Sequence, residues 1–414
     1  MRILFIPYHS GAISHGIPLL ALNGMLNVRW AESAFLFPAK AHKAARQMGV
    51  KVLDIDHNGF RSEMKAYAQF RPHVVIDDSS LTTGMATALT GLPRITIQRT
   101  GLFPGTAPKR SGHRHSLGLD VKQAPDITAL GLEQPQNLPD LFKAPVKIVP
   151  GIRSLEVLPY ELQDDPSYYF SGPLITDDYL VNKSERTPER ENDLSNCTEL
   201  DLLSAYFDNQ SNRKRVYVTF GTVAHAYKEI FECIRYLLNE GIAVVSSVKL
   251  EGLTPGEKEL YCYVNYLPMH YVCSKVDLMV HQCGSGTYHY PILHNVPTIT
   301  MGTKCYDRED VALRLEELGA SVHIASPDET EDFAGKFRGA IEKYFDHSGE
   351  FIREKKKNIA RLWEEIEQTQ AAFNIEAALK RAISSCKNIK SGAKTLGSNS
   401  QTHARQAHYI VGNR

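Results

Sequence analysis

One histidine and two aspartates in the first hundred residues have the types and spacing for acid–base chemistry. His15 lies in a loop after the apolar run Ile3–Pro7 and just before a segment of helical period. Asp77 and Asp78 end a second apolar run that begins at Val74. In doubly wound sheets, ligands sit beyond the carboxyl ends of the strands, so these side chains are expected at one edge. A neutral imidazole there could remove a proton from a hydroxyl, with one carboxylate orienting its other nitrogen.

The residues leave two choices open in this catalytic group. Either Asp77 or Asp78 could orient the imidazole, and we prefer Asp78. His9 is a nearby rival of His15 as the base. Both aspartates could instead cap the helix that follows, as Ser79 and Ser80 could too.

A glycine-rich turn in the second half could bind an anion. An apolar strand expected at Leu278–Gln282 runs into Gly284-Ser285-Gly286-Thr287, which precedes a segment that can be helical. Several backbone N–H groups and the positive end of that helix could converge on a diphosphate. Such a site needs no metal. Asp54-Ile55-Asp56 has the form of a metal-binding Asp-x-Asp, but it lies outside this half of the chain and is typical of a turn, so we assign no metal.

The elements that must position these residues have an α/β pattern. Short apolar runs alternate with stretches of helical period, which is typical of mainly parallel sheets. The first half is expected to form strands at Ile3–Pro7, Val52–Ile55, Val74–Ile76, Ile95–Gln98, Lys147–Val149 and Tyr168–Ser171. The second half is expected to form strands at Val216–Phe220, Ala243–Val248, Cys262–Tyr266, Leu278–Gln282, Thr298–Met301 and Val322–Ile324. Two doubly wound, Rossmann-like domains facing a cleft are the economical arrangement.

The glycine-rich turn stands in a longer block with a recognisable order. Tyr266-Leu267-Pro268 precedes the turn, and Asn295-Val296-Pro297 and Tyr306-Asp307-Arg308 follow it. This block resembles the donor-binding region of UDP-glycosyltransferase-like enzymes, the natural-product glycosyltransferases of bacterial type with the GT-B fold. The step from His15 to Leu22 and the strand–turn at Val218–Val223 also resemble that family, which places a catalytic histidine and a diphosphate loop there.

The resemblance implies the residues that bind a nucleoside diphosphate sugar. They are Gly221, Thr222, Tyr266, Leu267, His281, Gln282, Gly284, Ser285, Gly286, Thr287, Asp307 and Arg308. Three positions depart from the family pattern. Gln282 stands where many relatives have a second histidine, Arg308 replaces the glutamine of an acidic–Gln pair, and Tyr290 falls near a glutamate that holds ribose hydroxyls. These changes leave the sugar and the choice between UDP and dTDP open.

The resemblance also implies a domain organisation. We expect an acceptor-binding domain at 1–181, a polar linker at 182–214, a nucleotide-sugar-binding domain at 215–367, a helix at 368–383 that crosses back onto the first domain, and a largely disordered tail at 384–414. The acceptor pocket is expected in the first domain, with contacts from Thr100, Gly101 and Phe103.

Composition excludes several kinds of partner. Among 414 residues, Lys plus Arg and Asp plus Glu both number 47, so no net charge favours nucleic acid or a membrane surface. No apolar run reaches transmembrane or signal-peptide length, and seven scattered cysteines favour a reducing compartment, so we expect a cytoplasmic protein without cofactor. The sequence leaves a homodimer open.

The expected function is inverting, metal-independent transfer of a hexose from a UDP- or dTDP-sugar to a hydroxyl of a small, natural-product-like acceptor. Two alternatives keep the GT-B fold. A sugar-nucleotide epimerase would need acid–base groups around the donor sugar alone, and a non-catalytic auxiliary partner would assist another glycosyltransferase. The altered Gln282 and Arg308 motivate the second alternative.

Overall fold

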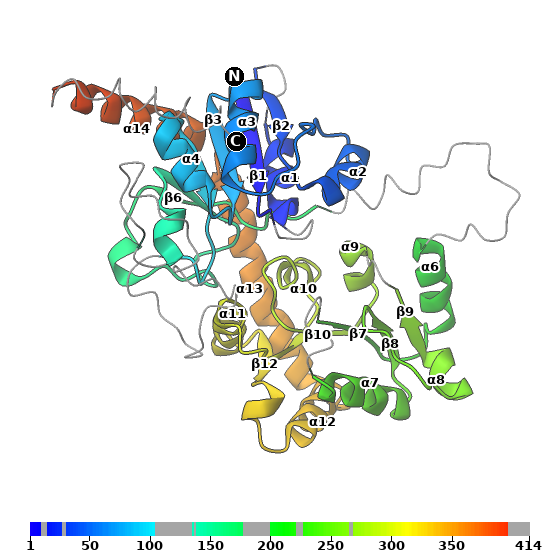
Figure 1. Cartoon of the computed structure of the whole chain (residues 1–414). Coiled ribbons are helices and arrows are strands. Elements are labelled where there is room, and N and C mark those ends of the chain that lie inside the picture. The colour runs from blue at the N-terminus through cyan, green and yellow to red at the C-terminus, as the bar shows by residue number, and fades with distance from the viewer. Residues whose placement is uncertain are drawn as a thin grey trace, which may run out of the picture. The chain divides into compact units, whose positions relative to one another are not determined.

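The computed structural model describes residues 1–9, 15–26, 30–103, 135, 138–176, 199–220, 227–264 and 268–395. These residues form two compact units. The first contains the described residues up to 176 together with those from 369 on, and the second contains those between 177 and 368. Each unit is built on one parallel six-stranded sheet with helices against it (Figure 1). No helix of the described part is both long and apolar enough to cross a membrane.

The sheet of the first unit has the strand order β2-β1-β3-β4-β5-β6. Its central strands are nearly continuous apolar runs, and Ile3, Leu4, Phe5 and Ile6 are fully buried, as expected when helices cover both faces of a parallel sheet. The strands are β1 (Arg2–Pro7), β2 (Glu32–Phe35), β3 (Val74–Asp78), β4 (Arg94–Ile97), β5 (Val146–Val149) and β6 (Tyr168–Phe170).

Helices pack on both faces of this first sheet. Apolar side chains of α1 and α14 share one core with Ile3 and Phe5, whereas those of α3 and α4 share another with Leu4 and Ile6. Alternation of side chains along β1 explains the two cores. The helices are α1 (Ile17–Gly24), α2 (Ala39–Gln47), α3 (Phe60–Phe70), α4 (Thr83–Thr90) and α14 (Ile375–Thr395), with short 3-10 turns at η4 (Leu138–Phe142) and η5 (Tyr160–Leu162).

The sheet of the second unit has the order β12-β11-β10-β7-β8-β9. Its strands are β7 (Arg215–Thr219), β8 (Ala243–Ser246), β9 (Tyr261–Tyr263), β10 (Leu278–His281), β11 (Thr298–Met301) and β12 (Ser321–Ile324). One core joins Val216, Val244 and Val280 of the sheet to Ile234 of α7 and Phe337 of α12. The helices are α6 (Glu199–Asn209), α7 (Glu229–Asn239), α8 (Pro255–Leu260), α9 (Met269–Cys273), α10 (His289–Leu293), α11 (Tyr306–Glu317) and α12 (Phe333–Tyr344), with a 3-10 turn at η9 (Pro327–Glu329).

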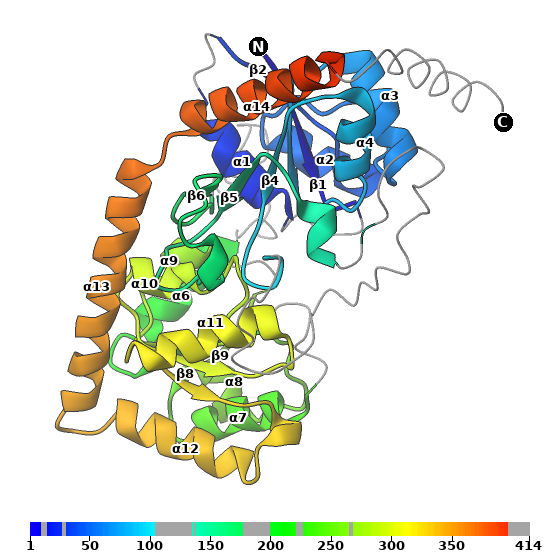
Figure 2. The same ribbon diagram turned by 90° about the vertical axis from the view of Figure 1, so that its left-hand side faces the viewer.

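The end of the described chain returns to the first unit. After α13 (Glu350–Ala372), helix α14 lies along the first sheet (Figure 2) and buries Ala378, Leu379 and Ala382 against it. The last helix is predicted to end at Ile383 and to be followed by a largely disordered tail at 384–414, whereas α14 continues to Thr395. No proline or glycine occurs between Ile383 and Ser391, so helix propagation meets no strong breaker there.

One predicted strand is wrong. Val52–Ile55 forms only an isolated bridge from Val52 to Phe35, and the strand beside β1 is instead β2 (Glu32–Phe35). Two polar residues, Glu32 and Ser33, open β2 at the edge of the sheet, so its apolar signal is short. The other predicted strands are present with ends shifted by a few residues.

Candidate functional site

The first candidate site lies where the strand order of the first sheet reverses. β2 follows β1 on one side and β3 lies on the other, and the carboxyl ends of β1 and β3 meet at Pro7 and Asp78. Ligands of open α/β sheets bind at such reversal points. His15, on the turn before α1, places Nδ1 3.4 Å from Oδ1 of Asp78, with 21% of its side chain exposed and Asp78 fully buried. This separation is long for a hydrogen bond and is a close polar contact.

The structure separates the two aspartates that the sequence leaves equivalent. Successive side chains of a strand point to opposite faces. The Asp77 carboxylate is held by Arg94, through Nε–Oδ1 at 2.7 Å and Nη2–Oδ2 at 3.0 Å, and it accepts a hydrogen bond from Thr96. Asp78 faces His15 instead. Its geometry therefore fits the orienting role, and that of Asp77 fits a buried structural ion pair.

A row of aromatic rings begins beside His15. Tyr8 meets the His15 ring edge-on at 5.5 Å and the His9 ring at 5.1 Å, and His9 in turn lies 5.6 Å from His57. Burial lowers the pKa of His9. Burial, and next the neighbouring His9, lower the pKa of His57 to about 3. Burial therefore favours the neutral form of His9 and of His57 in the physiological range.

The predicted acceptor residues follow β4 at the same edge of the sheet. The backbone N–H of Thr100 donates to Oε2 of the buried Glu156 at 2.6 Å. Gly101 has a φ of 100°, a conformation that favours glycine. The Phe103 ring is 2% exposed and packs edge-on against Tyr168. In this conformation Phe103 stabilises the fold of the segment.

The second candidate site lies at the corresponding reversal in the second sheet, between β7 and β10, where His281 pairs with Thr219. After β10 the chain turns through Cys283, whose φ of 60° is unusual for a residue with a side chain. The N–H of Thr287 donates to the Gly284 carbonyl at 2.7 Å. Ser285 and Gly286 are exposed at the tip, and their N–H groups bond no other described residue.

The helix after this turn is shorter than expected. α10 begins only at His289 and has five residues, with Pro291 inside it and Val296-Pro297 soon after. A helix this short aligns few peptide dipoles. Anion binding at the turn must therefore depend on its N–H groups and on neighbouring side chains, and not on a long helix.

Two side chains bring hydrogen-bond donors to the turn. Nη1 of Arg308, in the first turn of α11, donates to Oε1 of Gln282 at 2.8 Å. This bond turns Nε2 of Gln282 toward Gly284, where a Cβ built on the glycine would lie 3.8 Å from Nε2 and 3.6 Å from the Thr287 hydroxyl. The amide NH2 of Gln282 and the hydroxyl of Thr287 thus lie near Gly284, the guanidinium of Arg308 is bonded to Gln282, and the next two residues of the turn have exposed backbone. Such a set suits a phosphate.

His281 lies beneath the turn and is fully buried. Its Nδ1 accepts a hydrogen bond from the N–H of Cys283 at 2.9 Å, which leaves the proton of the neutral ring on Nε2. Nε2 is buried and makes no hydrogen bond to any described residue. Burial lowers the pKa of His281 to about 3, so the ring is neutral and holds an unused donor.

Four predicted donor residues, Gly221, Thr222, Tyr266 and Leu267, lie outside the described residues. Asp307 lies beside Arg308 at the start of α11. Within the described ranges, no three His, Cys, Asp or Glu side chains form a group that could hold a metal ion.

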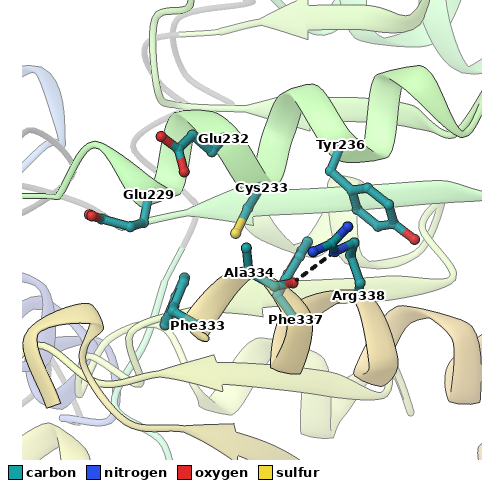
Figure 3. A pocket seen from close by; sticks show the side chains of 8 residues that line it. All are labelled: Glu229, Glu232, Cys233, Tyr236, Phe333, Ala334, Phe337 and Arg338. Atoms are coloured by element: carbon teal, nitrogen blue, oxygen red, sulfur yellow. Dashed lines mark hydrogen bonds between the residues drawn. The ribbon is translucent and has the colours of Figure 1, made fainter. Parts of the chain in front are cut away.

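A pocket of ≈ 260 Å³ in the second unit involves none of the predicted site residues. It lies between α7 and α12, with Glu229, Glu232, Cys233 and Tyr236 on one side and Phe333, Ala334, Phe337 and Arg338 on the other (Figure 3). Nε of Arg338 donates to the Ala334 carbonyl at 3.4 Å within its own helix. Nothing in the pocket links it to the two candidate sites.

Sequence reasoning missed Arg99, whose guanidinium clamps both oxygens of Asp78. A signal for it exists. Arg99 follows β4 directly and Asp78 ends β3, and neighbouring parallel strands bring their carboxyl ends together. Opposite charges at two such ends are expected to pair.

Comparisons with solved structures identify the architecture. The spinosyn forosaminyltransferase is 16% identical, with a TM-score of 0.65 over 93% of this chain and 99% of that one. The glycosyltransferase of kitacinnamycin is 16% identical, with a TM-score of 0.64 over 92% and 99%. The spinosyn rhamnosyltransferase in complex with thymidine diphosphate is 17% identical, with a TM-score of 0.61 over 89% and 96%. The chain therefore has the GT-B fold, which confirms the predicted fold class of two doubly wound, Rossmann-like domains.

Sequence comparison reaches a shorter part of the chain. It is 30% identical over 119 residues to the 4'-demethylrebeccamycin synthase of Lentzea aerocolonigenes, a match of 28% of this chain. The match spans 27% of that relative's length. No protein-family model matches the chain.

Proposed function

We propose that this chain is an inverting, metal-independent glycosyltransferase that moves a hexose from a nucleoside diphosphate donor to a hydroxyl of a small, natural-product-like acceptor. The observation that carries the proposal is the placement of both candidate sites at strand-order reversals of a GT-B fold. An imidazole against a buried carboxylate stands at the reversal in the first unit, and a donor-rich turn stands at the one in the second.

The acceptor is activated by His15. With Asp78 next to Nδ1, the tautomer that carries its proton on Nδ1 is favoured, which leaves Nε2 free to accept the hydroxyl proton. The acceptor oxygen forms its bond to the anomeric carbon while the bond from that carbon to the diphosphate oxygen breaks. A single displacement of this kind inverts the anomeric centre.

The diphosphate gains negative charge as it leaves. We assign its stabilisation to the hydrogen-bond donors of the turn, which are Gln282 Nε2, the Arg308 guanidinium, the Thr287 hydroxyl and the N–H groups of Ser285 and Gly286. Of the predicted residues, Asp307 remains a proposed contact of the sugar, as do Gly221, Thr222, Tyr266 and Leu267 of the nucleotide.

Two observations favour dTDP over UDP within this proposal. Tyr290, near the position where the resembling family holds ribose hydroxyls with a glutamate, has no carboxylate and is buried against His270. Thymidine diphosphate is also the nucleotide held by three structurally similar glycosyltransferases, one of them the spinosyn rhamnosyltransferase. A deoxyribose has no 2'-hydroxyl for such a glutamate to bind.

The test combines a binding screen with product analysis. Pure protein is screened by thermal shift against UDP, dTDP, GDP and their sugars, and incubations with acceptor mixtures are analysed by mass spectrometry. We expect saturable stabilisation by dTDP, transfer that EDTA leaves unchanged, and inverted anomeric configuration by NMR. The absence of any nucleotide response would contradict the donor site.

A matched pair of variants tests the base. His15→Ala should lower the transfer rate by about a thousandfold with unchanged dTDP binding, since His15 belongs to the first unit and the donor turn to the second. His9→Ala, at the neighbouring ring, should keep most of the activity. Full activity of His15→Ala would exclude it as the base.

A further inference from the structure

Asp78 has a stronger partner than His15. Arg99 donates from Nη1 to Oδ1 and from Nη2 to Oδ2 of Asp78, both at 2.7 Å, and Nη1 also lies 3.3 Å from the Ser79 hydroxyl. The Ser79 hydroxyl donates to Oδ1 at 2.9 Å. A two-pronged arginine–carboxylate pair is rigid as well as strong, because the planar guanidinium matches the carboxylate. The carboxylate that faces His15 therefore has a fixed orientation.

The Arg99–Asp78 ion pair also changes the electrostatic environment of His15. Oδ1 faces His15 Nδ1 at 3.4 Å and at the same time accepts from Arg99 and Ser79. Burial alone would raise the pKa of Asp78, but the Arg99 guanidinium outweighs it and holds that pKa well below its usual range. Asp78 stays ionised, and most of its charge is compensated by a guanidinium with 12% of its side chain exposed.

The neighbouring ion pair shows what a purely structural clamp looks like here. Arg94 holds Asp77 in the same two-pronged way on the opposite face of β3, with both side chains almost fully buried and no histidine among the described residues bonded to Asp77. The Arg94–Asp77 pair is the arrangement expected where an arginine only neutralises a buried aspartate. The Arg99 clamp differs because its carboxylate shares an oxygen with a partly exposed imidazole.

Resting on the proposed function, we infer that Arg99 is a positioning residue for the His15–Asp78 pair, which fixes the Asp78 carboxylate and limits how strongly it stabilises a protonated His15. A base must be unprotonated before it can accept a proton. An uncompensated buried carboxylate beside His15 would favour the imidazolium and reduce the share of active base. Asp78 can therefore favour the His15 tautomer that carries its proton on Nδ1, while Arg99 keeps it from strongly stabilising the imidazolium form.

The other titratable groups near His15 are few in the described structure. Tyr8, whose ring meets His15, and His9 both follow β1. His57 precedes α3, Asp77 lies on β3 behind Asp78, and Glu156 accepts a hydrogen bond from the N–H of Thr100. The pKa values of His9 and His57 are lowered, chiefly by burial, so both are neutral near pH 7. The charges that face His15 itself are therefore Asp78 and, through it, Arg99.

The inference is tested first without substrate. The imidazole signals of full-length, histidine-labelled protein are followed with pH by NMR, and the His15 signal is assigned by its loss in His15→Gln. In Arg99→Met the midpoint of the His15 titration should rise by about one pH unit, or about tenfold in proton affinity. In Arg99→Lys, which keeps a cation but loses the fork, the rise should be smaller. An unchanged midpoint in folded Arg99→Met would overturn the inference, and so would an unchanged midpoint in Arg99→Lys should Arg99→Met not fold.

Kinetics then separate a positioning role from a structural one. In Arg99→Met the acid limb of the pH–rate profile should move to higher pH by the same amount as the NMR midpoint, with KM for the donor unchanged. A limb that stays in place while the midpoint moves would overturn the role in catalysis. A failure of the proposed function is recognised separately, because wild-type protein would then show no transfer while the NMR result stands on its own.

Discussion

At the scale of single residues, the two side chains that depart from the family pattern beside the Gly284–Thr287 turn contact each other. Gln282 stands where many members of the resembling family have a second histidine, and Arg308 replaces a glutamine. Taken separately, each change removes a contact. The bond from Arg308 Nη1 to Gln282 Oε1 joins them into one unit that turns an amide NH2 toward Gly284 and brings a guanidinium close to the turn. The cation of Arg308 can therefore replace the charge that a second histidine would supply.

Loss of this guanidinium should weaken nucleotide binding. We expect Arg308→Met to raise the Kd for dTDP about tenfold, the effect of losing one charge-assisted hydrogen bond and its orientation of Gln282. Isothermal titration calorimetry measures it. Arg314→Met is the control, because Arg314 lies on the same helix but pairs with Glu317. An equal loss in both variants would mean that the general charge of α11, and not the Gln282 contact, is responsible.

At the scale of elements, a buried carboxyl ties helix α3 to the segment that follows β3. Oε1 of Glu63 accepts hydrogen bonds from the hydroxyls of Thr82 and Ser80, and Oε2 accepts one from Tyr67. Glu63 is fully buried. Burial raises its pKa to about 7 although the hydrogen bonds from Thr82 and Ser80 act in the opposite direction. The Glu63 carboxyl group thus anchors the segment that begins with Asp78 and Ser79 to α3. Because its pKa is raised in the folded protein, folding favours the protonated form of this group.

This raised pKa predicts a pH-dependent stability. Glu63 favours the folded state most when it is protonated, below about pH 4.5, and this contribution is lost as the pH rises toward about 7. Glu63→Gln, which stays neutral, should therefore be more stable than wild type at pH 8, by at most about 3 kcal/mol. Thermal unfolding between pH 5 and 8 measures the difference.

The control for this prediction is Glu161→Gln, an exposed position in the same unit. It should leave the pH dependence as in wild type. A Glu63→Gln variant that is equally or less stable than wild type at pH 8 would show that the hydroxyl contacts need the full charge of the carboxylate.

At the scale of the whole molecule, the first unit is completed by residues from the far end of the chain. Helix α14 packs Ile375, Ala378, Leu379 and Ala382 into the core that contains Ile3 and Phe5. β1 and β3, which lead to His15 and Asp78, are therefore covered by a segment that begins only at Ile375. The candidate acid–base site depends in this way on packing by the last helix.

Removal of one side chain of α14 should destabilise the first unit. Leu379→Ala leaves a cavity at a 1% exposed position and should lower the free energy of unfolding by about 2–5 kcal/mol. Chemical denaturation, read by hydrogen exchange at β1 and β7, assigns the loss to one unit. We expect earlier exchange at β1 and no change at β7. Lys380→Ala, the exposed next residue, is the control.

The sequence by itself determined the α/β class, the two parallel sheets and the edge at which chemistry is expected. Apolar runs such as Ile3–Pro7 and Thr298–Met301 form strands because parallel strands are buried on both faces, so local pattern and final burial agree. The polar turn chemistry at the ends of these runs, at His15, Asp78 and Gly284–Thr287, is equally local. Such local features can be predicted correctly even when the predicted order of the strands is wrong.

Several features of the molecule depend on tertiary contacts and could not be predicted from the local sequence pattern. β2 was missed because an edge strand needs little apolar sequence, and α10 proved short although its residues can form a helix. The distinct contacts of Asp77 and Asp78 depend on which arginine each one meets, Arg94 on β4 or Arg99 beyond its end. The contact of Gln282 with Arg308 depends on the neighbouring positions of the β10 turn and α11. These contacts join residues distant in sequence, so only the packed sheet, which brings the carboxyl ends of separate strands together, could determine them.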